Sequence, residues 1–484
     1  MRRGRATLVD MSNVTAYGHD LRHDPAALNA SFADARPVSF WLDSPDRPQA
    51  RPALAHDLDT DLLVVGGGYC GLWTALIAKE RDPGRRVVLV DCHRIGWAAS
   101  GRNGGFVEAS LTHGADNGRR HFADELPILD RLAEENFEAL AATIERYGID
   151  AEFERAGELT VATEPHQVPW LREAADAGEG VFLEGEALRA VGGSPLYRAG
   201  LMAEHGTAYV HPAKLAWGLA RVAEELGVVV HEGTPALRLR RDGDRVEVDT
   251  PRGRILAARV ALATNGFPSL LPSRRLFTVP IYDYVLMTEP LSAAQLHAIG
   301  WTGRHGITDS GREFHYYRKS ADDRILFGGY DAIYHRGRRI RPSQDERAAS
   351  FERLADHFLS TFPQLDGIRF THRWGGMIDM STQLVAFHGA AHGGRVAYSA
   401  GYTGLGVAAT RFGAETMLDL LEGRDTARTR LRMARRLPIP IPPEPVAYPL
   451  IQAMRRAVAA SDRNGGKDGL LLRAAGWLGV GFDS

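Results

Sequence analysis

A glycine-rich turn near residue 66 constrains the fold of this chain more than any other feature. An apolar run at 62–65 precedes it, and helix-compatible residues at 72–78 follow it. Gly66, Gly68 and Gly71 fit the spacing G-x-G-x-x-G. In a strand–turn–helix unit the first glycine permits a tight turn, the second lets backbone approach a pyrophosphate, and the third lets the helix pack on the strand. The positive end of the helix then favours the phosphates.

A second apolar run supports this interpretation. Residues 87–90 end on Asp91, about 20 residues beyond the last glycine, where an acidic side chain binds ribose hydroxyls. The alternative is an ordinary βαβ turn without a ligand, because glycine-rich turns also arise in that context. With Asp91 at this spacing, we predict a dinucleotide-binding unit over about residues 57–91.

The composition argues against several other classes of protein. The chain has 484 residues, enough for two or three units with cores of their own. A formal net charge of -2 gives no strong overall field toward nucleic acid. Its two cysteines do not make a disulfide framework. No apolar stretch reaches the roughly 20 residues that span a bilayer, and none follows the basic N-terminus, so we expect a cytoplasmic protein.

One basic run, at residues 428–436, suggests nucleic acid at first sight. It has no interleaved aromatic residues and precedes a proline-rich segment, so a solvated surface explains it better. We therefore expect no nucleic-acid partner.

Three further motifs follow the glycine turn in chain order. They are Ser100-Gly101-Arg102-Asn103-Gly104-Gly105, Ala263-Thr264-Asn265-Gly266 and Gly401-Tyr402-Thr403-Gly404-Leu405-Gly406. Together with the first fingerprint, this set resembles the FAD-dependent amine and amino-acid oxidoreductase family, typified by D-amino-acid oxidase, glycine oxidase and sarcosine oxidase. The form of residues 96–105, with Phe40-Trp41-Leu42 ahead of the fingerprint, is similar to γ-glutamylputrescine oxidoreductases and aminophosphonate oxidoreductases. The resemblance covers about residues 38–425.

The resemblance implies an α/β FAD-binding Rossmann-like domain interleaved with an α+β substrate domain on a mostly antiparallel sheet. Apolar runs at 228–230 and 260–264 agree, since the nucleotide unit then resumes after an insertion. We expect the FAD-binding domain at 58–110, 205–275 and 385–425, the substrate domain at 111–204 and 276–384, an N-terminal arm at 1–57 and a C-terminal tail at 426–484.

The resemblance also implies which residues bind FAD. Glycine backbone lies against the flavin where a side chain would clash, and the helix after the last motif stabilises negative charge on the flavin with its N-terminus. The alternatives are an arginine paired to a local carboxylate at Arg102, and plain turns elsewhere. The expected cofactor-binding residues are Gly66, Gly68, Gly71, Asp91, Ser100, Arg102, Asn103, Gly104, Gly105, Thr264, Asn265, Gly401, Gly404, Leu405 and Gly406.

The attachment of FAD is expected to be non-covalent. Family members that tether FAD use a cysteine late in the chain, or a histidine just after the tryptophan that corresponds to Trp97. In this chain no cysteine follows Cys92, and Ala98 occupies the histidine position.

The family places its substrate on the sheet of the second domain, above the flavin. Strand alternation puts Tyr282 and Tyr284 on one face of a strand, and likewise His315, Tyr317 and Lys319 on another. For each of them, packing in the core or at the surface is the alternative. The expected catalytic residues are Tyr282, Tyr284, His315, Tyr317, Lys319 and Trp374, with Lys319 also a candidate for favouring reaction with oxygen.

Two further features concern the substrate. Arg318 and Arg373 are candidates for binding a carboxylate or phosphonate. After Trp374 the family carries a Thr-Pro-Asp-like turn, whereas this chain has Ser-Thr-Gln at 381–383. This departure weakens any transfer of substrate contacts at that turn.

The sequence thus predicts an enzyme that oxidises an amine or amino acid at its C–N bond, with hydride transfer to flavin N5. Water hydrolyses the resulting imine to an aldehyde or keto acid, and O2 or another acceptor takes the electrons. The alternative is a flavin-binding subunit of a larger oxidoreductase without turnover of its own. A pyridine-nucleotide-dependent reductase would need a second G-x-G-x-x-G unit, which the middle of the sequence lacks.

Overall fold

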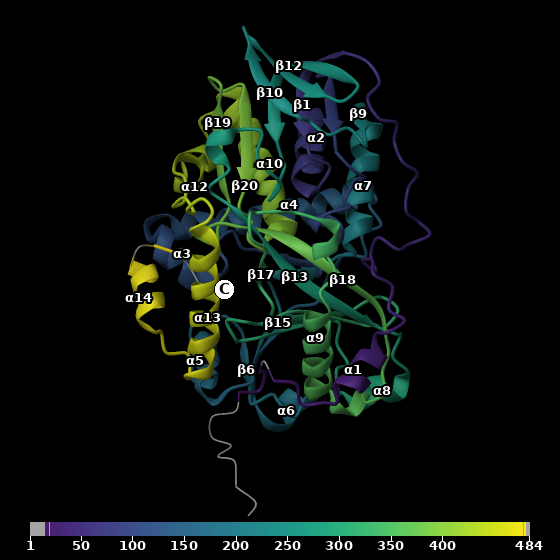
Figure 1. The fold of residues 1–484 in the computed structure, drawn as a ribbon, viewed down its shortest axis with the longest axis vertical. Helices are drawn as coiled ribbons and strands as arrows, with labels where there is room; N and C mark the ends of the chain where they lie inside the picture. The colour runs from purple at the N-terminus through teal and green to yellow at the C-terminus, as the bar shows by residue number, and fades with distance from the viewer. Residues whose placement is uncertain (1–14, 19, 478, 481–484) are drawn as a thin grey trace, which may run out of the picture.

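The computed structural model describes residues 15–18, 20–477 and 479–480. Within these residues the strands form one sheet of eight strands, one of nine and a small one of three. Figure 1 shows the first sheet in the upper half of the molecule and the second in the lower half. The chain passes between the two halves several times, as expected of interleaved domains.

The first sheet has the order β10-β11-β12-β1-β2-β9, with β20 beside β12 and β19 beside β20. Its strands are β1 (Leu58–Val65), β2 (Val87–Val90), β9 (Val228–His231), β10 (Arg238–Asp242), β11 (Arg245–Thr250), β12 (Gly253–Leu262), β19 (Phe387–Ala391) and β20 (Val396–Ala400). Strands β20, β12, β1, β2 and β9 run parallel, whereas β10 and β11 form an antiparallel hairpin. The apolar runs of β1 and β2 are buried because both faces of a parallel sheet are covered.

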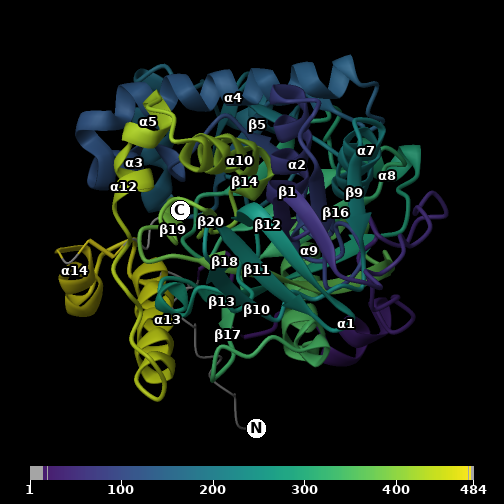
Figure 2. The ribbon, with the colours of Figure 1, turned by 90° about the horizontal axis from the view of Figure 1, so that it is seen from above.

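Helices cover one face of the first sheet, as Figure 2 shows. They are α2 (Tyr69–Arg81), α4 (Leu126–Arg146), α7 (Pro212–Glu225) and α10 (Gly406–Glu422). Leu72 of α2, Leu219 of α7 and Phe412 of α10 are buried in one hydrophobic cluster with strand residues such as Val64. This cluster fixes where the N-termini of α2 and α10 lie relative to the strand ends.

The second sheet has the order β17-β13-β16-β15-β14-β5-β7-β6, with β18 beside β13. Its strands are β5 (Glu158–Ala162), β6 (Val181–Leu183), β7 (Ala199–Ala203), β13 (Val279–Thr288), β14 (Gly306–Asp309), β15 (His315–Lys319), β16 (Ile325–Gly329), β17 (Ile333–Tyr334) and β18 (Phe370–Met380). Its described pairings are antiparallel except for β14 with β5. Helix α9 (Ala348–Thr361) packs on one face through Phe351 and Phe358. The molecule therefore combines an α/β unit with an α+β unit, as the sequence predicts.

The small sheet joins β3 (Phe106–Glu108), β8 (Thr207–Tyr209) and β4 (Glu154–Arg155). It lies between the two large sheets, since Phe106 contacts Tyr316 of β15 and Val107 packs into the cluster around α10. Its strands come from both sides of the boundaries expected at residues 110 and 204.

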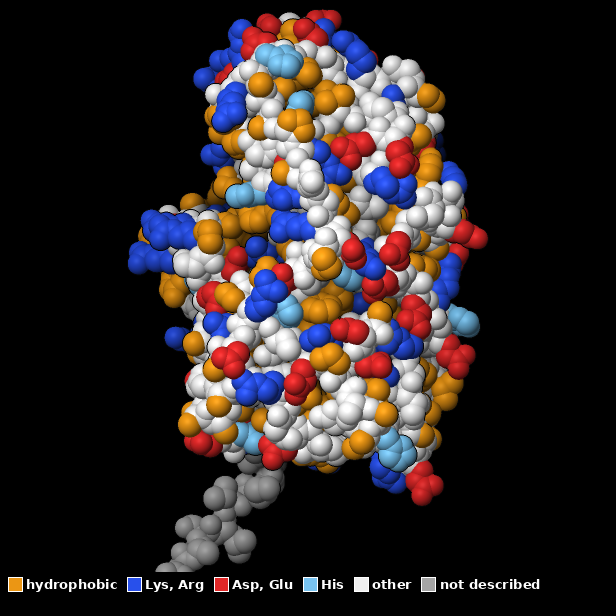
Figure 3. All heavy atoms as spheres, turned by 90° about the vertical axis from the view of Figure 1, so that its right-hand side faces the viewer, with side chains coloured by type: hydrophobic (Ala, Val, Ile, Leu, Met, Phe, Trp, Pro, Cys, Tyr) orange, Lys and Arg blue, Asp and Glu red, His pale blue; other side chains and the backbone are white. Residues whose placement is uncertain are grey.

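The terminal segments wrap the body. Helix α1 (Pro25–Ser31) packs against α9, and Trp41 of the arm is fully buried. The remaining helices are α3 (Gly114–Phe122), α5 (Val168–Asp176), α6 (Gly185–Arg189), α8 (Ala293–Ala298), α11 (Ala427–Arg430), α12 (Arg432–Arg435), α13 (Ala447–Arg463) and α14 (Leu470–Trp477). Acidic and basic side chains are interspersed over most of the face in Figure 3. Among the described residues, no helix combines the length and apolarity that a membrane crossing needs.

Candidate active site

The glycine turn has the close contacts that its motif predicts. Gly66 has φ +114°, and a Cβ there would collide with the carbonyl oxygen of Ala263 on β12. A Cβ on Gly71 would overlap the carbonyl oxygen of Gly66, so the third glycine lets α2 pack against β1. Gly68 is the residue before α2, and a Cβ there would come within 2.9 Å of Ser100 Oγ. All three glycines therefore stand where side chains do not fit.

Asp91 and Ser100 hold this turn in place. Asp91 Oδ2 accepts a hydrogen bond from Gly67 N at 2.6 Å, and its Oδ1 accepts one from His93 N at 2.7 Å. Burial raises the pKa of Asp91, against these hydrogen bonds. Ser100 Oγ accepts from Tyr69 N at 2.9 Å, in the first turn of α2. Asp91 thus lies at the end of β2 beside the glycine turn, the position from which an acidic group reaches a ribose.

Hydrogen bonds within the loop at 100–105 and from two tryptophans distant in sequence hold this loop in place. Asn103 Nδ2 donates to Ala99 O at 2.9 Å, and Gly105 N donates to Asn103 Oδ1 at 2.8 Å. The indole of Trp41 in the arm donates to Asn103 O at 3.0 Å, and that of Trp374 on β18 donates to Arg102 O at 2.8 Å. The loop therefore has a defined shape before any ligand binds.

Gly104 and Gly105 let this loop approach its neighbours closely. A Cβ on Gly104 would lie 2.8 Å from the ring of Tyr316. Gly105 has φ +79°, and a Cβ there would collide with Val210 O. At these two glycines the loop thus meets its neighbours through backbone atoms.

Arg102 pairs with a carboxylate. Its Nη1 contacts Asp345 Oδ2 and donates to Gly375 O at 3.1 Å, and its Nε donates to Trp97 O at 2.9 Å. Burial raises the pKa of Asp345, while the arginine opposes that rise. These contacts tie the loop to the second unit, which is the alternative role that the sequence left open for Arg102.

The last motif forms an open turn before α10. Gly401 and Gly404 have φ +81° and +96°, and the atom nearest to a Cβ on Gly404 would be His113 Cε1, at 3.9 Å. Helix α10 begins at Gly406, and Leu405 before it has no side-chain acceptor to cap the helix. The N–H groups of its first turn are thus turned to the open side, where the helix dipole is positive.

Asp379 supports this turn from β18. Gly401 N donates to its carboxylate, Thr403 N donates to its carbonyl oxygen at 3.3 Å, and burial raises the pKa of Asp379 to about 7. Thr264 and Asn265 lie nearby at the end of β12, where they line a cavity of about 220 Å³ together with Tyr398. Asn265 has φ +51°, so this turn is tight as well.

These four segments meet at the C-terminal ends of β1, β12 and β20 and at the N-termini of α2 and α10. They present glycine backbone, uncapped helix ends and a carboxylate at the ribose position. This donor set fits an adenine dinucleotide: the N-terminus of α2 would hold its pyrophosphate, and the start of α10 would hold its ring system.

The second sheet turns two different faces to its surroundings. Val285 and Trp374 belong to the hydrophobic cluster of the first sheet's helices, so their face is turned to the 100–105 loop. Tyr282, Tyr284 and Tyr317 belong instead to the cluster around α9. The two faces thus separate residues that the sequence grouped as one substrate site.

Most of the expected catalytic residues lie on the α9 face. Tyr284 OH donates to Gln344 O at 2.9 Å and its ring contacts Phe351, while Tyr317 OH bonds Tyr197 OH at 2.6 Å. Lys319 Nζ donates to Trp301 O at 2.7 Å. The alternation itself is as predicted, but it turns these side chains away from the loop; Trp374 alone of the expected set reaches it.

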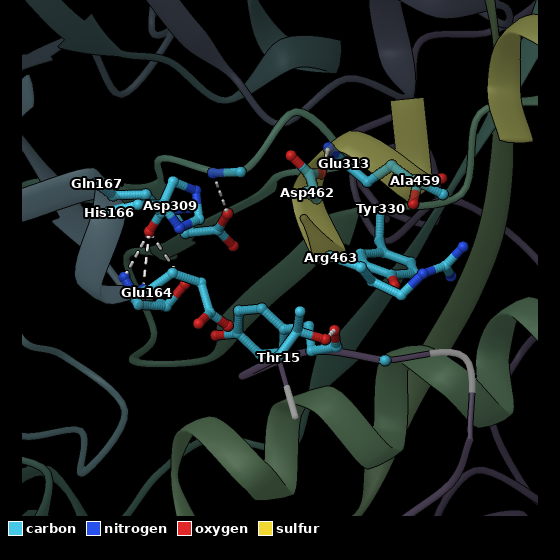
Figure 4. Close-up of a pocket in the computed structure, with 14 residues that line it drawn as sticks. Thr15, Glu164, His166, Gln167, Asp309, Glu313, Tyr330, Ala459, Asp462 and Arg463 are labelled. Atoms are coloured by element: carbon cyan, nitrogen blue, oxygen red, sulfur yellow. Dashed lines mark hydrogen bonds between the residues drawn. The ribbon is translucent and has the colours of Figure 1, made fainter. Parts of the chain in front are cut away.

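His315 also lies on the α9 side. Its Nδ1 is 2.7 Å from Asp309 Oδ2 and its Nε2 is 2.9 Å from His357 Nδ1, and burial lowers the pKa of His357. A pocket of about 40 Å³ lies beside Asp309. Figure 4 shows Glu164 and Asp462 among the residues of its wall. His315 therefore belongs to a buried polar network on the α9 side, and its role as a substrate contact stays a prediction.

Other residues occupy the face that meets the loop. Tyr316 OH donates to Asp283 Oδ2 at 2.6 Å, and burial raises the pKa of Asp283 to about 6. The ring of Tyr316 contacts Phe106 in an edge-to-face arrangement. Asp283 and Tyr316 are each one position away from an expected site residue. The alternation in a strand shows which residues share a face, but it does not show which face of the sheet meets the loop.

Comparisons with known proteins agree with this geometry. The family model described as "FAD dependent oxidoreductase" matches residues 61–420. The oxidoreductase OrdL of Rhizobium meliloti is 30% identical over 84% of this chain and 92% of its own length. Gamma-glutamylputrescine oxidoreductase of Escherichia coli is 29% identical, over 80% of this chain and 89% of its own.

Among solved structures, glycine oxidase from Geobacillus kaustophilus superimposes with a TM-score of 0.64 at 19% identity, covering 76% of this chain and 96% of its own. That likeness concerns the fold. With the family match over most of the chain and the cofactor geometry above, the protein belongs to the FAD-dependent oxidoreductase family.

Proposed function

We propose that this flavoenzyme oxidises the C–N bond of an amine or amino acid to an imine, which water hydrolyses to an aldehyde or keto acid. One observation carries the proposal. The backbone of Gly104 lies directly against the ring of Tyr316, whose hydroxyl donates to Asp283, so the loop and this polar wall of the second sheet form one continuous surface. A substrate on this surface would lie next to the ring system of the cofactor. The names of the related γ-glutamylputrescine oxidoreductase and glycine oxidase support this donor class.

When bound, FAD supplies the hydride acceptor for this reaction. The protein chain orients the cofactor and the substrate and supplies an electrostatic field at the reacting atoms. The N-terminus of α2 would hold the pyrophosphate, and the N–H groups at the start of α10 would stabilise negative charge on the reduced ring system.

The electron acceptor stays open between O2 and another oxidant. Lys319, the sequence candidate for favouring oxygen, has its ammonium bonded to Trp301 O on the α9 side. We therefore do not assign it that role.

The proposal is tested by anaerobic reduction of the flavin. The full chain loaded with FAD is mixed with a panel of primary amines, secondary amines and amino acids, and flavin absorbance near 450 nm is followed. Loss of absorbance with at least one class is expected. A flavin that stays oxidised with every compound, yet is reduced by dithionite, contradicts the proposal and favours the alternative of a subunit without turnover.

A further inference from the structure

Helix α14, near the C-terminus, turns apolar side chains outward. Leu470, Ala474 and Trp477 recur at the spacing i, i+4, i+7, which places them on one face of the helix. All three are exposed, with 84% of the surface of Leu470 and 87% of that of Trp477 accessible. Leu472 points to the opposite side and is buried. The helix therefore packs on the protein with Leu472 and presents an apolar face to solvent, the reverse of an ordinary surface helix.

Specific contacts hold the start of α14 against the body of the protein. Asp468 Oδ1 lies 2.5 Å from Arg312 Nη1, and Asp462 of α13 accepts from Arg312 N at 3.3 Å. Gly466 has φ +75°, and a Cβ there would come within 2.9 Å of the indole of Trp170 on α5. Figures 1 and 2 show α14 at the outer edge of the molecule, beyond α13. The apolar face thus belongs to a docked helix.

The segment that carries this face is positively charged. Its exposed basic side chains are Arg456, Arg463, Lys467 and Arg473. Within the part of the chain that the structure describes, none of the four forms an ion pair. The acidic residues at 447–477 are Asp462 and Asp468, and both bond to Arg312. Carboxylates of the segment are therefore engaged by the body, while its cations are available to an external partner.

We propose that α14 docks this protein on the surface of an anionic lipid bilayer. In the docked state Leu470 and Trp477 lie between the lipid headgroups and the acyl chains, and the exposed basic side chains contact lipid phosphates. This inference goes beyond the proposed function and does not depend on it.

The length and composition of α14 fit the interfacial region of a bilayer. Eight residues of α-helix rise about 12 Å, less than half of the roughly 30 Å hydrocarbon core, so the helix lies on the bilayer and does not cross it. Tryptophan is favoured at the headgroup level because its ring is apolar and its N–H is polar. An apolar face flanked by lysine and arginine is typical of helices that lie in this region, and each basic residue adds attraction to anionic lipid.

A second copy of the chain fits this face less well. A stable protein interface buries about 800 Å² on each partner and involves about 20–30 residues a side, whereas α14 offers one face of an eight-residue helix. A symmetric pairing through α14 would also bring the unpaired cations of two segments together, which is unfavourable. An anionic bilayer needs no matching side chains and carries the opposite charge.

Vesicle binding tests the inference. The full chain loaded with FAD is mixed with vesicles of phosphatidylcholine alone, or of phosphatidylcholine with an equal amount of phosphatidylglycerol. Sedimentation of the vesicles then gives the lipid concentration that binds half of the protein. We expect this concentration to be at least about 10-fold lower for the anionic vesicles. Binding to them is expected to weaken as NaCl is raised, because salt screens the charges.

Two double variants separate the apolar and charged contributions. L470S/W477S is expected to raise the half-binding lipid concentration at least about 10-fold, because two large apolar side chains no longer leave water. K467Q/R473Q is expected to raise it for anionic vesicles alone. Leu237→Ser is the matched control, since Leu237 is 60% exposed but lies just before β10, and it should bind like the wild type. All of the substituted side chains are exposed, so melting temperature and FAD content should stay those of the wild type.

Quenching by lipids with brominated acyl chains locates the contact. Tryptophan emission of the wild type is expected to fall when it binds anionic vesicles that contain these lipids. Trp477→Phe keeps an apolar ring, so its half-binding concentration should stay within about 3-fold of the wild type while the quenching is largely lost. Quenching that persists in Trp477→Phe would place the contact elsewhere and overturn the inference.

Other outcomes also decide against the bilayer. Binding to neither kind of vesicle, equal binding to both, or unchanged binding of L470S/W477S overturns the inference. A dimer that forms with rising protein concentration in sedimentation velocity, and that L470S/W477S abolishes, assigns the face to a second copy and overturns it as well. None of these results depends on reduction of the flavin by an amine, so the proposed function stands or fails separately.

Discussion

At the scale of single residues, two carboxyl groups are held where the fold favours their neutral form. Glu108 and Asp379 both have a pKa raised by burial, to about 8 and about 7. Asp379 has backbone N–H partners at the turn before α10, whereas Glu108 has another carboxylate as its neighbour. The first arrangement shapes the turn before α10, and in the second the charge of Glu158 adds to the effect of burial on Glu108.

The Glu108→Gln variant is predicted to flatten the pH dependence of stability. A carboxyl whose pKa is raised on folding binds more protons in the folded than in the unfolded state, so stability falls as pH rises from its unfolded pKa near 4.5 to about 8. Each pKa unit corresponds to about 1.4 kcal/mol. The melting temperature of the wild type is therefore expected to drop more between pH 5 and pH 8 than that of the variant.

The measurement is thermal unfolding at several pH values without amine. E204Q is the control and should keep the slope of the wild type, because Glu204 is exposed. A slope in Glu108→Gln equal to that of the wild type would show that this carboxyl is not the one that titrates.

At the scale of elements, two helix N-termini stand at the proposed cofactor site. Helix α2 starts after Gly68 and helix α10 starts after Leu405, and neither of these residues carries a side-chain acceptor that would neutralise the helix end. The positive ends of both dipoles are thus available to a ligand with negative charge. The first suits a pyrophosphate and the second a ring system that gains negative charge on reduction.

A negative charge at the start of α10 is predicted to lower the reduction potential of the bound flavin. In Leu405→Asp the carboxylate caps the helix and opposes negative charge on the reduced ring system, whereas Leu405→Asn caps it without a charge. A difference of about 1 kcal/mol corresponds to roughly 20 mV for two electrons. Redox titration against a reference dye should show the Asp variant below the Asn variant; equal potentials would place the flavin away from this helix end.

Much of this arrangement can be predicted from sequence, and one part cannot. The strand at 62–65, the three glycines and the helix after residue 406 follow from local patterns that have a single physical meaning. The residues of the substrate wall do not follow from such patterns. Strand alternation shows that His315 and Tyr317 lie on the same face of the sheet, but it does not show whether that face meets the 100–105 loop or α9. Only the position of α9, with Phe351 and Phe358 against that face, decides it. The residues at the wall, Asp283 and Tyr316, lie on the other face for the same reason.

At the scale of the whole molecule, the cofactor connects parts of the chain that are distant in sequence. Its expected contacts come from segments near residues 66–71, 100–105, 264–265 and 401–406. Because these segments are brought together only by folding, the unfolded chain has no such site. The one cysteine in these segments, Cys70, is buried with its sulfur accepting a hydrogen bond from Tyr402, and burial raises its pKa to about 12.

FAD is therefore predicted to be held without a covalent bond. Acid precipitation should leave all of the yellow colour in the supernatant, with no fluorescent band on a denaturing gel. Excess FAD should raise the melting temperature of the chain, because the ligand binds only the folded state. At 1,000 times its Kd, FAD is expected to add about 4 kcal/mol to the free energy of unfolding. Flavin that stays with the precipitate would contradict this prediction.

The two indole clamps on the 100–105 loop have a consequence for biosynthesis. One clamp, Trp41, is translated before the loop, but the other, Trp374, is translated about 270 residues after it. A nascent polypeptide on the ribosome therefore lacks half of what shapes its coenzyme cradle until most of the message has been read. Capture of the coenzyme belongs to the final stage of synthesis or to the released chain.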